Sequence, residues 1–149
     1  MKKSVCLVLL LLVLSLLLAA HAEEYGIADI LPDSNVWGMT TDAFQSAFPG
    51  SYSSAQVGKA PALVKSNLSV EGYPMSAYYV FADGNLSKIT YVLMDDSDKS
   101  AVKACASKLT DAMSAAVGAA GTEGKGVIEW NDGTIQIGTA KLKIQTSHI

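Results

Sequence analysis

The amino-terminal residues set how much of this chain is left to fold. Met1-Lys2-Lys3-Ser4 precedes a leucine-rich apolar run (residues 5–20), and Ala20-His21-Ala22 then supplies the small residues that a signal peptidase reads. The run is shorter than the roughly 20 apolar residues that a membrane-spanning helix needs. We expect residues 1–22 to be a cleaved signal peptide, with a retained leucine-rich anchor as the alternative. About 127 residues, 23–149, then form one domain.

The composition limits the partners of that domain. The full chain has a formal net charge of −3 at pH 7 and contains no arginine, and the leader carries two of its lysines. Arginine provides bidentate recognition of phosphate and guanine, and negative charge repels polyanions. We therefore expect no nucleic-acid ligand, and no membrane contact after the leader is removed.

The use of cysteine points to a compartment. Outside the leader the sequence has a single cysteine, Cys105, which cannot form an intramolecular disulfide. Exported eukaryotic domains of this size are usually rich in disulfides. The sequence therefore favours a bacterial protein that is secreted or periplasmic.

Periodic patterns predict a helix, three strands, a second helix and three more strands. The first helix is expected to begin after Thr40 and to stop at Pro49-Gly50, and the second to open at Asp96-Ser97-Asp98 and to end near Gly118. The expected strands are 62–70, 75–82, 86–94, 127–130, 134–138 and 140–146. The stretch before the first helix, residues 23–35, shows no sustained period and is expected to be a lead-in segment.

These elements predict an α+β fold. The economical arrangement is a two-layer sandwich, in which an antiparallel sheet of about six strands carries both helices on one face. Asp83-Gly84-Asn85 predicts a tight hairpin turn because Gly and Asn tolerate positive φ. Strand alternation sends Val64, Leu68 and Tyr79 toward the helices and polar side chains toward water.

The polar side of the expected sheet is the candidate binding surface. Its candidate partner-binding residues are Lys65, Tyr78, Lys88, Thr90, Gln136, Lys141 and Lys143. Four of these are lysines, so we expect the open sheet face to be locally positive although the chain is acidic. Such a face favours a partner that presents carboxylates.

The layout and one short motif resemble a known group. Val36-Trp37-Gly38-Met39-Thr40, leading into a short helix, is similar to the start of many small exported bacterial domains. The order of helices before antiparallel strands resembles the beta-lactamase-inhibitor-like proteins, which include small lipoproteins of outer-membrane barrel assembly. This chain lacks the inhibitor's disulfides and the lipoproteins' lipid-bearing cysteine. The resemblance therefore implies only a binding module that uses its open sheet face.

Motifs that could carry chemistry all have simpler interpretations. Ser100 and Lys103 fit S-x-x-K, but the companion elements of the enzymes that use it are absent. His148 lies one residue from the end of the sequence, where a fixed catalytic geometry is not expected. The run Asp95-Asp96-Ser97-Asp98 lacks the spacing of a calcium loop and is expected to cap the second helix. Cys105 is expected to pack in the core. We therefore expect no catalytic residue, metal site or cofactor.

The sequence leaves three classes of function open. The leading hypothesis is an exported, non-enzymatic protein-binding or inhibitor-like module, whose partner is an exported or envelope protein with an acidic surface. The alternative is a small-molecule carrier or sensor domain of the cell envelope, with its ligand between helices and sheet. The third class is an enzyme of unfamiliar design.

Overall fold

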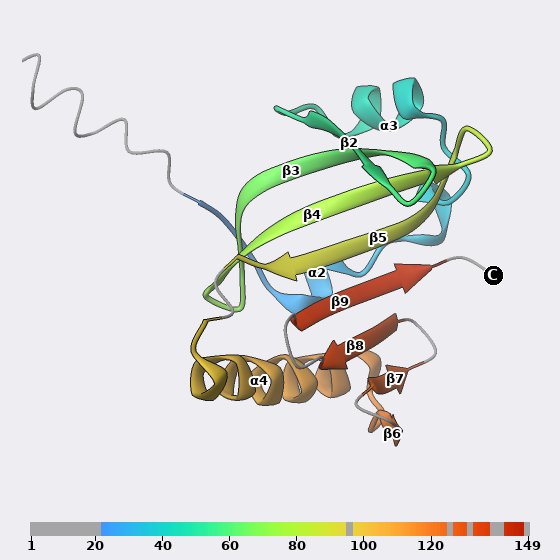
Figure 1. Ribbon diagram of the computed structural model, residues 1–149. Coiled ribbons are helices and arrows are strands. Elements are labelled where there is room, and N and C mark those ends of the chain that lie inside the picture. Colours follow the sequence, from blue (N-terminus) through green and yellow to red (C-terminus); the bar gives the residue numbers. More distant parts are fainter. Residues whose placement is uncertain (1–21, 95–96, 125–126, 131–132, 138–141, 148–149) are drawn as a thin grey trace, which may run out of the picture.

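The chain folds as an α+β domain in which helices cover one face of a single sheet (Figure 1), so the predicted class is confirmed. The computed structural model describes residues 22–94, 97–124, 127–130, 133–137 and 142–147. The elements are, in chain order, β1 (Glu23–Tyr25), α2 (Ile27–Ile30), the 3-10 helix η1 (Ser34–Val36), α3 (Thr41–Ala47), β2 (Ser53–Val57), β3 (Ala60–Val70), β4 (Tyr73–Ala82), β5 (Asn85–Leu93), α4 (Lys99–Val117), β6 (Thr122–Gly124), β7 (Val127–Trp130), β8 (Gly133–Ile137) and β9 (Leu142–Ser147).

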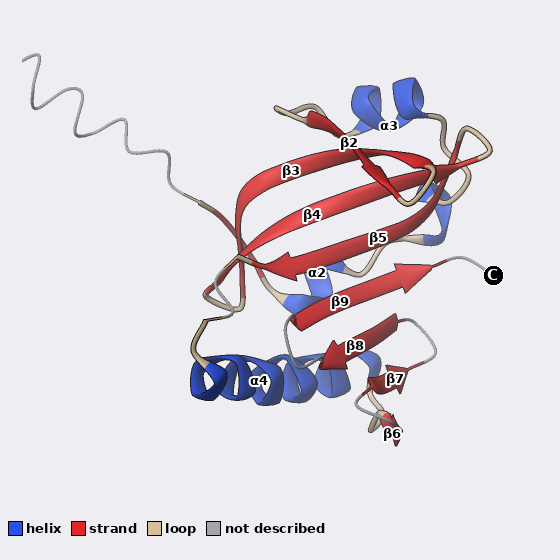
Figure 2. Ribbon diagram, viewed as in Figure 1, coloured by secondary structure: helices blue, strands red, loops and turns tan. Residues whose placement is uncertain are grey.

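The sheet has nine strands in the order β1-β3-β4-β5-β9-β8-β7-β6, with β2 also paired to β3 (Figure 2). Neighbouring strands are antiparallel except β1 and β3, which are parallel. The two predicted groups of three strands are present, and β9 pairs with β5, so both groups belong to one sheet. The sheet exceeds the expected six strands because β1, β2 and β6 are short strands, without a readable alternation, at its margins.

Two tight turns connect the central strands. Asp83 and Gly84 have φ of 51° and 81°, and the turn between β4 and β5 lies where the sequence predicts it. Glu71 and Gly72 have φ of 51° and 84° between β3 and β4. Two consecutive residues at positive φ match the right-handed twist of a hairpin, so the turn between β3 and β4 is as tight as the one between β4 and β5.

The two main helices begin and end at the predicted signals. The Thr40 hydroxyl accepts a hydrogen bond from Ala43 N at the start of α3. The Asp98 carboxylate accepts from Ser100 N and Ala101 N at the start of α4. Gly118 then ends α4 in the left-handed conformation, at φ 74°, which a glycine adopts without steric cost.

The helical segments cover one face of the sheet, and Figure 1 looks onto the other face. Cys105, Leu109 and Met113 of α4 are fully buried. They belong to one cluster with Ala106 of the same helix and with apolar side chains of the sheet and of the segments before β2: Ile27, Ile30, Val36, Phe44, Leu63, Leu68, Val70, Met75, Ala77, Phe81, Leu86, Ile89, Tyr91, Leu93 and Ile144. The predicted apolar stripe of the second helix and the core position of Cys105 are therefore confirmed.

The segment expected to be a lead-in contributes to this core. Residues 23–35 contain β1, α2 and the start of η1, and the side chains of Ile27 and Ile30 are buried. The strand β1 is anchored because Glu71 N donates to Tyr25 O at 2.9 Å and Ile27 N donates to the Glu71 carboxylate at 2.8 Å. Among the described residues, no helix combines the length and the apolar character needed to cross a bilayer.

A β-bulge in β3 corrects one part of the predicted alternation. The pairing with β4 shifts register between Lys65 and Leu68, and Asn67 has φ of 59°. Before the bulge, Val64 lies opposite Tyr78 and Lys65 lies opposite Ala77. Directly opposed residues share a sheet face, so Val64 points to the uncovered face and Lys65 to the covered one, the reverse of the prediction. Figure 1 shows that β3 bends sharply toward one end.

Candidate functional site

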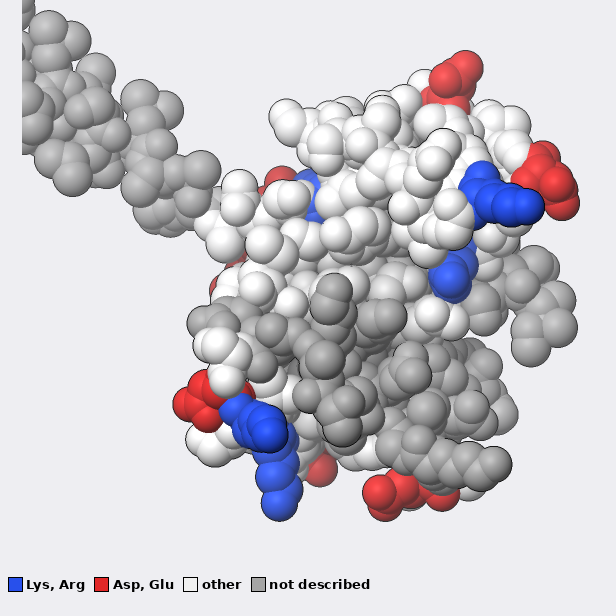
Figure 3. Space-filling view, in the orientation of Figure 1, with Lys and Arg blue, Asp and Glu red and all other residues white. Residues whose placement is uncertain are grey.

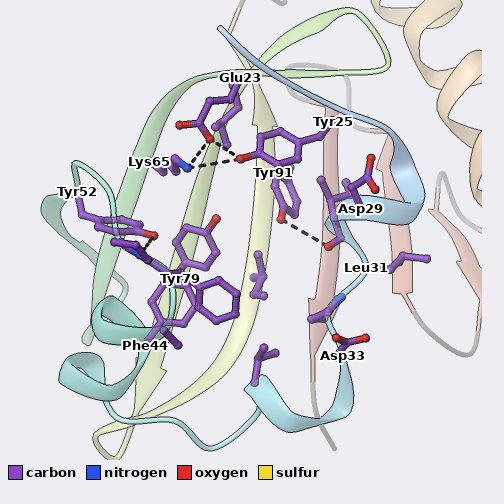
Figure 4. Close-up of a pocket in the computed structure, with 18 of the residues that line it drawn as sticks. Glu23, Tyr25, Asp29, Leu31, Asp33, Phe44, Tyr52, Lys65, Tyr79 and Tyr91 are labelled. Carbon is purple, nitrogen blue, oxygen red and sulfur yellow. Dashed lines mark hydrogen bonds and ion pairs between the residues drawn. The ribbon is translucent and has the colours of Figure 1, made fainter.

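A cavity lies on the covered face, between the sheet and the segments that precede β3. It has a volume of about 660 Å³. Its described lining residues come from β1, α2, α3 and their connections, and from β3, β4 and β5: Glu23, Tyr25, Ala28, Asp29, Ile30, Leu31, Pro32, Asp33, Val36, Phe44, Ala47, Phe48, Pro49, Tyr52, Lys65, Leu68, Tyr79, Ile89 and Tyr91. Figure 4 views this cavity from the helical side.

One end of the cavity holds a lysine with two partners. The Lys65 ammonium donates to the Glu23 carboxylate at 2.5 Å and to the Tyr25 hydroxyl at 3.5 Å. The Tyr25 hydroxyl in turn donates to the Glu23 carboxylate. The Lys65 side chain is 16% exposed, whereas the Glu23 side chain is 55% exposed. The cation therefore lies inside the site, and its counter-ion lies at the rim (Figure 4).

These contacts shift the protonation equilibria of all three groups. Burial alone lowers the pKa of Lys65, but the hydrogen bonds to Glu23 and Tyr25 outweigh it, and the net pKa is raised. The hydrogen bond from Lys65 lowers the pKa of Glu23, and the hydrogen bond to Glu23 raises the pKa of Tyr25. At neutral pH the group is therefore a cation, an anion and a neutral phenol.

An aromatic cluster forms a wall of the cavity. The ring centroid of Phe44 on α3 lies 4.7 Å from the ring centroid of Tyr79 on β4. It lies 6.0 Å from that of Tyr52 and 5.0 Å from that of Phe48. The Tyr52 hydroxyl donates to Phe48 O at 2.8 Å, which fixes its ring against the end of α3. Aromatic pairs at these separations hold one another in place and present a large apolar surface to a ligand.

The floor of the cavity carries two further phenols. Tyr79 and Tyr91 lie on β4 and β5, and the Tyr91 hydroxyl is within 3.5 Å of Ile30 O on α2. Burial raises the pKa of Tyr79 to about 12 and that of Tyr91 well above its ordinary value. Both phenols stay protonated at neutral pH and can orient a polar group of a bound molecule.

The structure separates the predicted binding residues. Lys65 lies on the covered face and lines the cavity, so its predicted place on the open face is wrong. Tyr78 lies directly opposite Thr90 on the uncovered face, and Lys88 lies on the same side of β5. Thr90 itself is buried, so its predicted role in contacting a partner is not supported. The backbones of Gln136 and Lys143 pair within that sheet, but their side chains, and all of Lys141, lie outside the described residues.

The described part of the uncovered face is mostly uncharged. In Figure 3, which shows this face, the described surface over the upper strands is mostly white, and lysines and carboxylates stand toward its edges. Within the described side chains, Lys88 is the one predicted lysine that lies there. The predicted positive character of the face therefore rests on Lys88 in the described part of the chain.

Sequence reasoning left open a ligand between helices and sheet but did not identify the residues that line this cavity. Tyr79 and Tyr91 were expected on the covered face as core side chains, and residues 23–35 were expected to form no element. The available signal was the tyrosine content of β4 and β5, since a phenol on a core face needs a polar partner or an opening.

Comparison with protein-family models, curated proteins and solved structures finds no match for this chain. The similarity to beta-lactamase-inhibitor-like proteins thus stays a prediction from the sequence. Within the described residues, no group of three or more His, Cys, Asp or Glu side chains is placed to hold a metal ion.

Proposed function

We propose that this chain is an exported carrier or sensor domain that binds a small molecule in the cavity between the sheet and the segments before β3. The observation that supports it is a cavity of about 660 Å³ lined by tyrosines, Phe44 and a lysine on the core face of a sheet. Ligand sites typically enclose roughly 300 to 1,000 Å³, with an apolar lining and a few convergent polar groups. The cavity has that size, and its lining combines apolar side chains with four tyrosines, one lysine and three carboxylates.

The proposal can be tested with a variant in which a large side chain fills the cavity and should prevent binding. Ala47 and Ala43, one turn apart on α3, are both exposed, but only Ala47 lines the cavity. A compound that binds the folded protein raises its Tm. In a thermal-shift screen of small metabolites, we expect a hit whose effect is abolished in A47W and retained in A43W. Equal responses in both variants would place the binding site elsewhere.

Export is part of the same proposal and has its own test. The small residues Ala20 and Ala22 support cleavage before Glu23. Expressed with its own leader, the protein should be recovered outside the cytoplasm with an intact mass that starts at Glu23. A mass that includes the leucine-rich run would show that the segment is retained as an anchor.

The uncovered sheet face remains a second proposal, for a protein partner. It is supported by Tyr78 and Lys88, an aromatic side chain and a cation on the same face of neighbouring strands. If this face binds an acidic envelope protein, Lys88→Glu should abolish its capture, whereas Lys103→Glu on the exposed side of α4 should not. Capture by both variants would argue against this face.

A further inference from the structure

Lys65 is a charged side chain on the covered face of the sheet, where its cross-strand neighbours are buried. Its neighbours across β4 and β5 are Ala77 and Tyr91, which are both buried. Removing an ammonium from water is costly unless an anion and further hydrogen-bond partners compensate it. The bulge at Asn67 is what turns Lys65 inward, so the position of the cation follows from the backbone of β3.

The anion that compensates Lys65 is loosely held. Glu23 is the first residue of β1, a strand of three residues, and more than half of its side chain is exposed. Ion pairs that are open to water on one side contribute only about 0.2 to 1 kcal/mol. The Glu23 carboxylate can therefore be replaced on Lys65 at little cost by another carboxylate that is better shielded from water.

The space next to Lys65 suits the remainder of such a molecule. From the ammonium, the cavity continues along Tyr25, Tyr79 and Tyr91 toward the aromatic wall at Phe44 (Figure 4). Asp29 and Asp33 are exposed, and the Asp29 carboxylate already accepts a hydrogen bond from Gly26 N at 2.8 Å. The carboxylates of the lining are thus exposed, the Lys65 ammonium lies deeper, and the walls between them are apolar with phenol hydroxyls.

We propose that the cavity takes a small monocarboxylic acid with an aryl or alkyl body, whose carboxylate displaces that of Glu23 from the Lys65 ammonium and the Tyr25 hydroxyl. The inference rests on the proposed carrier function and specifies its ligand class. Glu23 acts as a built-in competitor that satisfies Lys65 while the cavity holds no acid. Binding then frees the Glu23 side chain from Lys65, while the backbone of Glu23 stays paired with Leu68 of β3.

The test uses three probes that differ in their head groups. 4-Phenylbutyrate, 4-phenylbutyramide and 4-phenylbutylamine carry an anionic, a neutral and a cationic head group on similar phenylalkyl bodies. Calorimetric titration of the protein recovered after expression with its own leader should give saturable binding of the acid at millimolar concentrations or below. The amide should bind more weakly than the acid, and the amine should bind most weakly.

Two variants assign the head-group contact. Glu23→Gln removes the competing charge, so the affinity for phenylbutyrate should rise about twofold to fivefold, the fold-change that corresponds to an exposed ion pair. Lys65→Met should lower that affinity by more than about tenfold and leave the amide unaffected. Lys103→Met, on the exposed side of α4 and outside the cavity lining, is the matched control and should bind phenylbutyrate as the unmodified protein does. If Lys65→Met does not fold, the result with Glu23→Gln decides.

Several results would overturn the ligand class. They are a preference for the amine, a lower affinity for phenylbutyrate in Glu23→Gln, or no saturable binding of phenylbutyrate at millimolar concentrations. The carrier function is judged separately: it survives any of these results if another compound raises the Tm in A43W and fails to do so in A47W. If no compound separates these two variants, the carrier proposal itself is wrong.

Discussion

The two ends of the covered sheet face are built from different kinds of segment. One end is covered by α4, a helix of 19 residues whose Cys105, Leu109 and Met113 are fully buried. The other end is covered by α2, η1 and α3, which have four, three and seven residues. None of the described residues that line the cavity belongs to α4. A long amphipathic helix fills the space above a sheet evenly, whereas short segments joined by turns leave room.

The difference implies that one end of the sheet contributes mainly to stability and the other mainly to binding. Close packing beneath α4 contributes apolar burial, which dominates the free energy of folding. The end beneath α2 and α3 keeps hydroxyls and a charged ammonium in the place of packed methyl groups, and such groups add little to stability. We therefore expect substitutions under α4 to act mainly on folding and substitutions around the cavity to act mainly on binding.

The largest effect on stability is expected from Leu109→Ala, at the centre of α4. Leu109 is 0% exposed, and truncation of a buried leucine costs about 2–5 kcal/mol through lost burial and the void it leaves. Urea denaturation followed by circular dichroism should show this loss. Lys103→Ala, on the exposed side of the same helix, should stay within about 0.5 kcal/mol of the unmodified protein. A loss below about 1 kcal/mol in Leu109→Ala would break the contrast between the two ends.

The next largest effect should appear at alkaline pH and arise at the cavity end. Burial raises the pKa of Tyr79 from 10.0 to about 12, so the folded protein holds this proton more tightly than the unfolded chain does. Stability is then complete below about pH 10 and is lost as the pH rises toward 12, by at most about 2–3 kcal/mol. Urea titrations across this range should show the decline.

Two neighbouring tyrosines, Tyr79 and Tyr78, provide a variant and its control for the alkaline loss of stability. Tyr79→Phe should flatten the alkaline decline, whereas Tyr78→Phe, on the uncovered face, should retain it. Tyr91, whose pKa is also raised by burial, maintains part of the decline in both variants. An identical slope in Tyr79→Phe and in the unmodified protein would contradict the burial of this phenol.

A smaller effect is expected at the bulge that turns Lys65 into the cavity. Asn67 has φ of 59°, a conformation that costs a β-branched residue about 1–2 kcal/mol. Asn67→Val should lower the free energy of unfolding by that amount and weaken any binding that depends on Lys65. Asn67→Gly, which adopts positive φ freely, should preserve both. Equal stability of the two variants would argue against the register shift in β3.

The smallest effect on stability is expected from Lys65→Met. The partner of Lys65 is more than half exposed, so the loss of this ion pair should change the free energy of unfolding by less than about 1 kcal/mol. Chemical denaturation should therefore give nearly the same midpoint as in the unmodified protein. A loss comparable to that of Leu109→Ala would mean that Lys65 supports the fold and not a ligand.

The sequence predicts the parts of this fold that are specified locally. The hairpin at Asp83-Gly84, the start of α3 at Thr40 and the start of α4 at Asp98 each depend on a few neighbouring residues, and the structure has all of them. The apolar stripe of α4 was also readable, because its period of 3.6 residues extends over five turns.

The parts that could not be predicted depend on distant contacts or on one inserted residue. The strand β1 forms because β3, far away in sequence, offers it an edge, and nothing within Glu23–Tyr25 indicates a strand. The bulge shifts the phase of β3 by one residue, so a strict alternation places Lys65 on the wrong face. Since the cavity combines both features, its lining residues could not be predicted, although a ligand between helices and sheet was one of the alternatives.

The position of β1 also matters for how the protein is prepared. If the leader is cleaved before Glu23, the freshly cut end of the chain lies beside the mouth of the cavity, because Glu23 lines it. An affinity tag fused directly to that residue would add bulk at the entrance, and a protease that trims one residue too far would delete the counter-ion of Lys65. A sample with heterogeneous amino termini would then behave as a mixture of binding sites with different affinities. The intact mass should therefore be measured for every sample that is titrated.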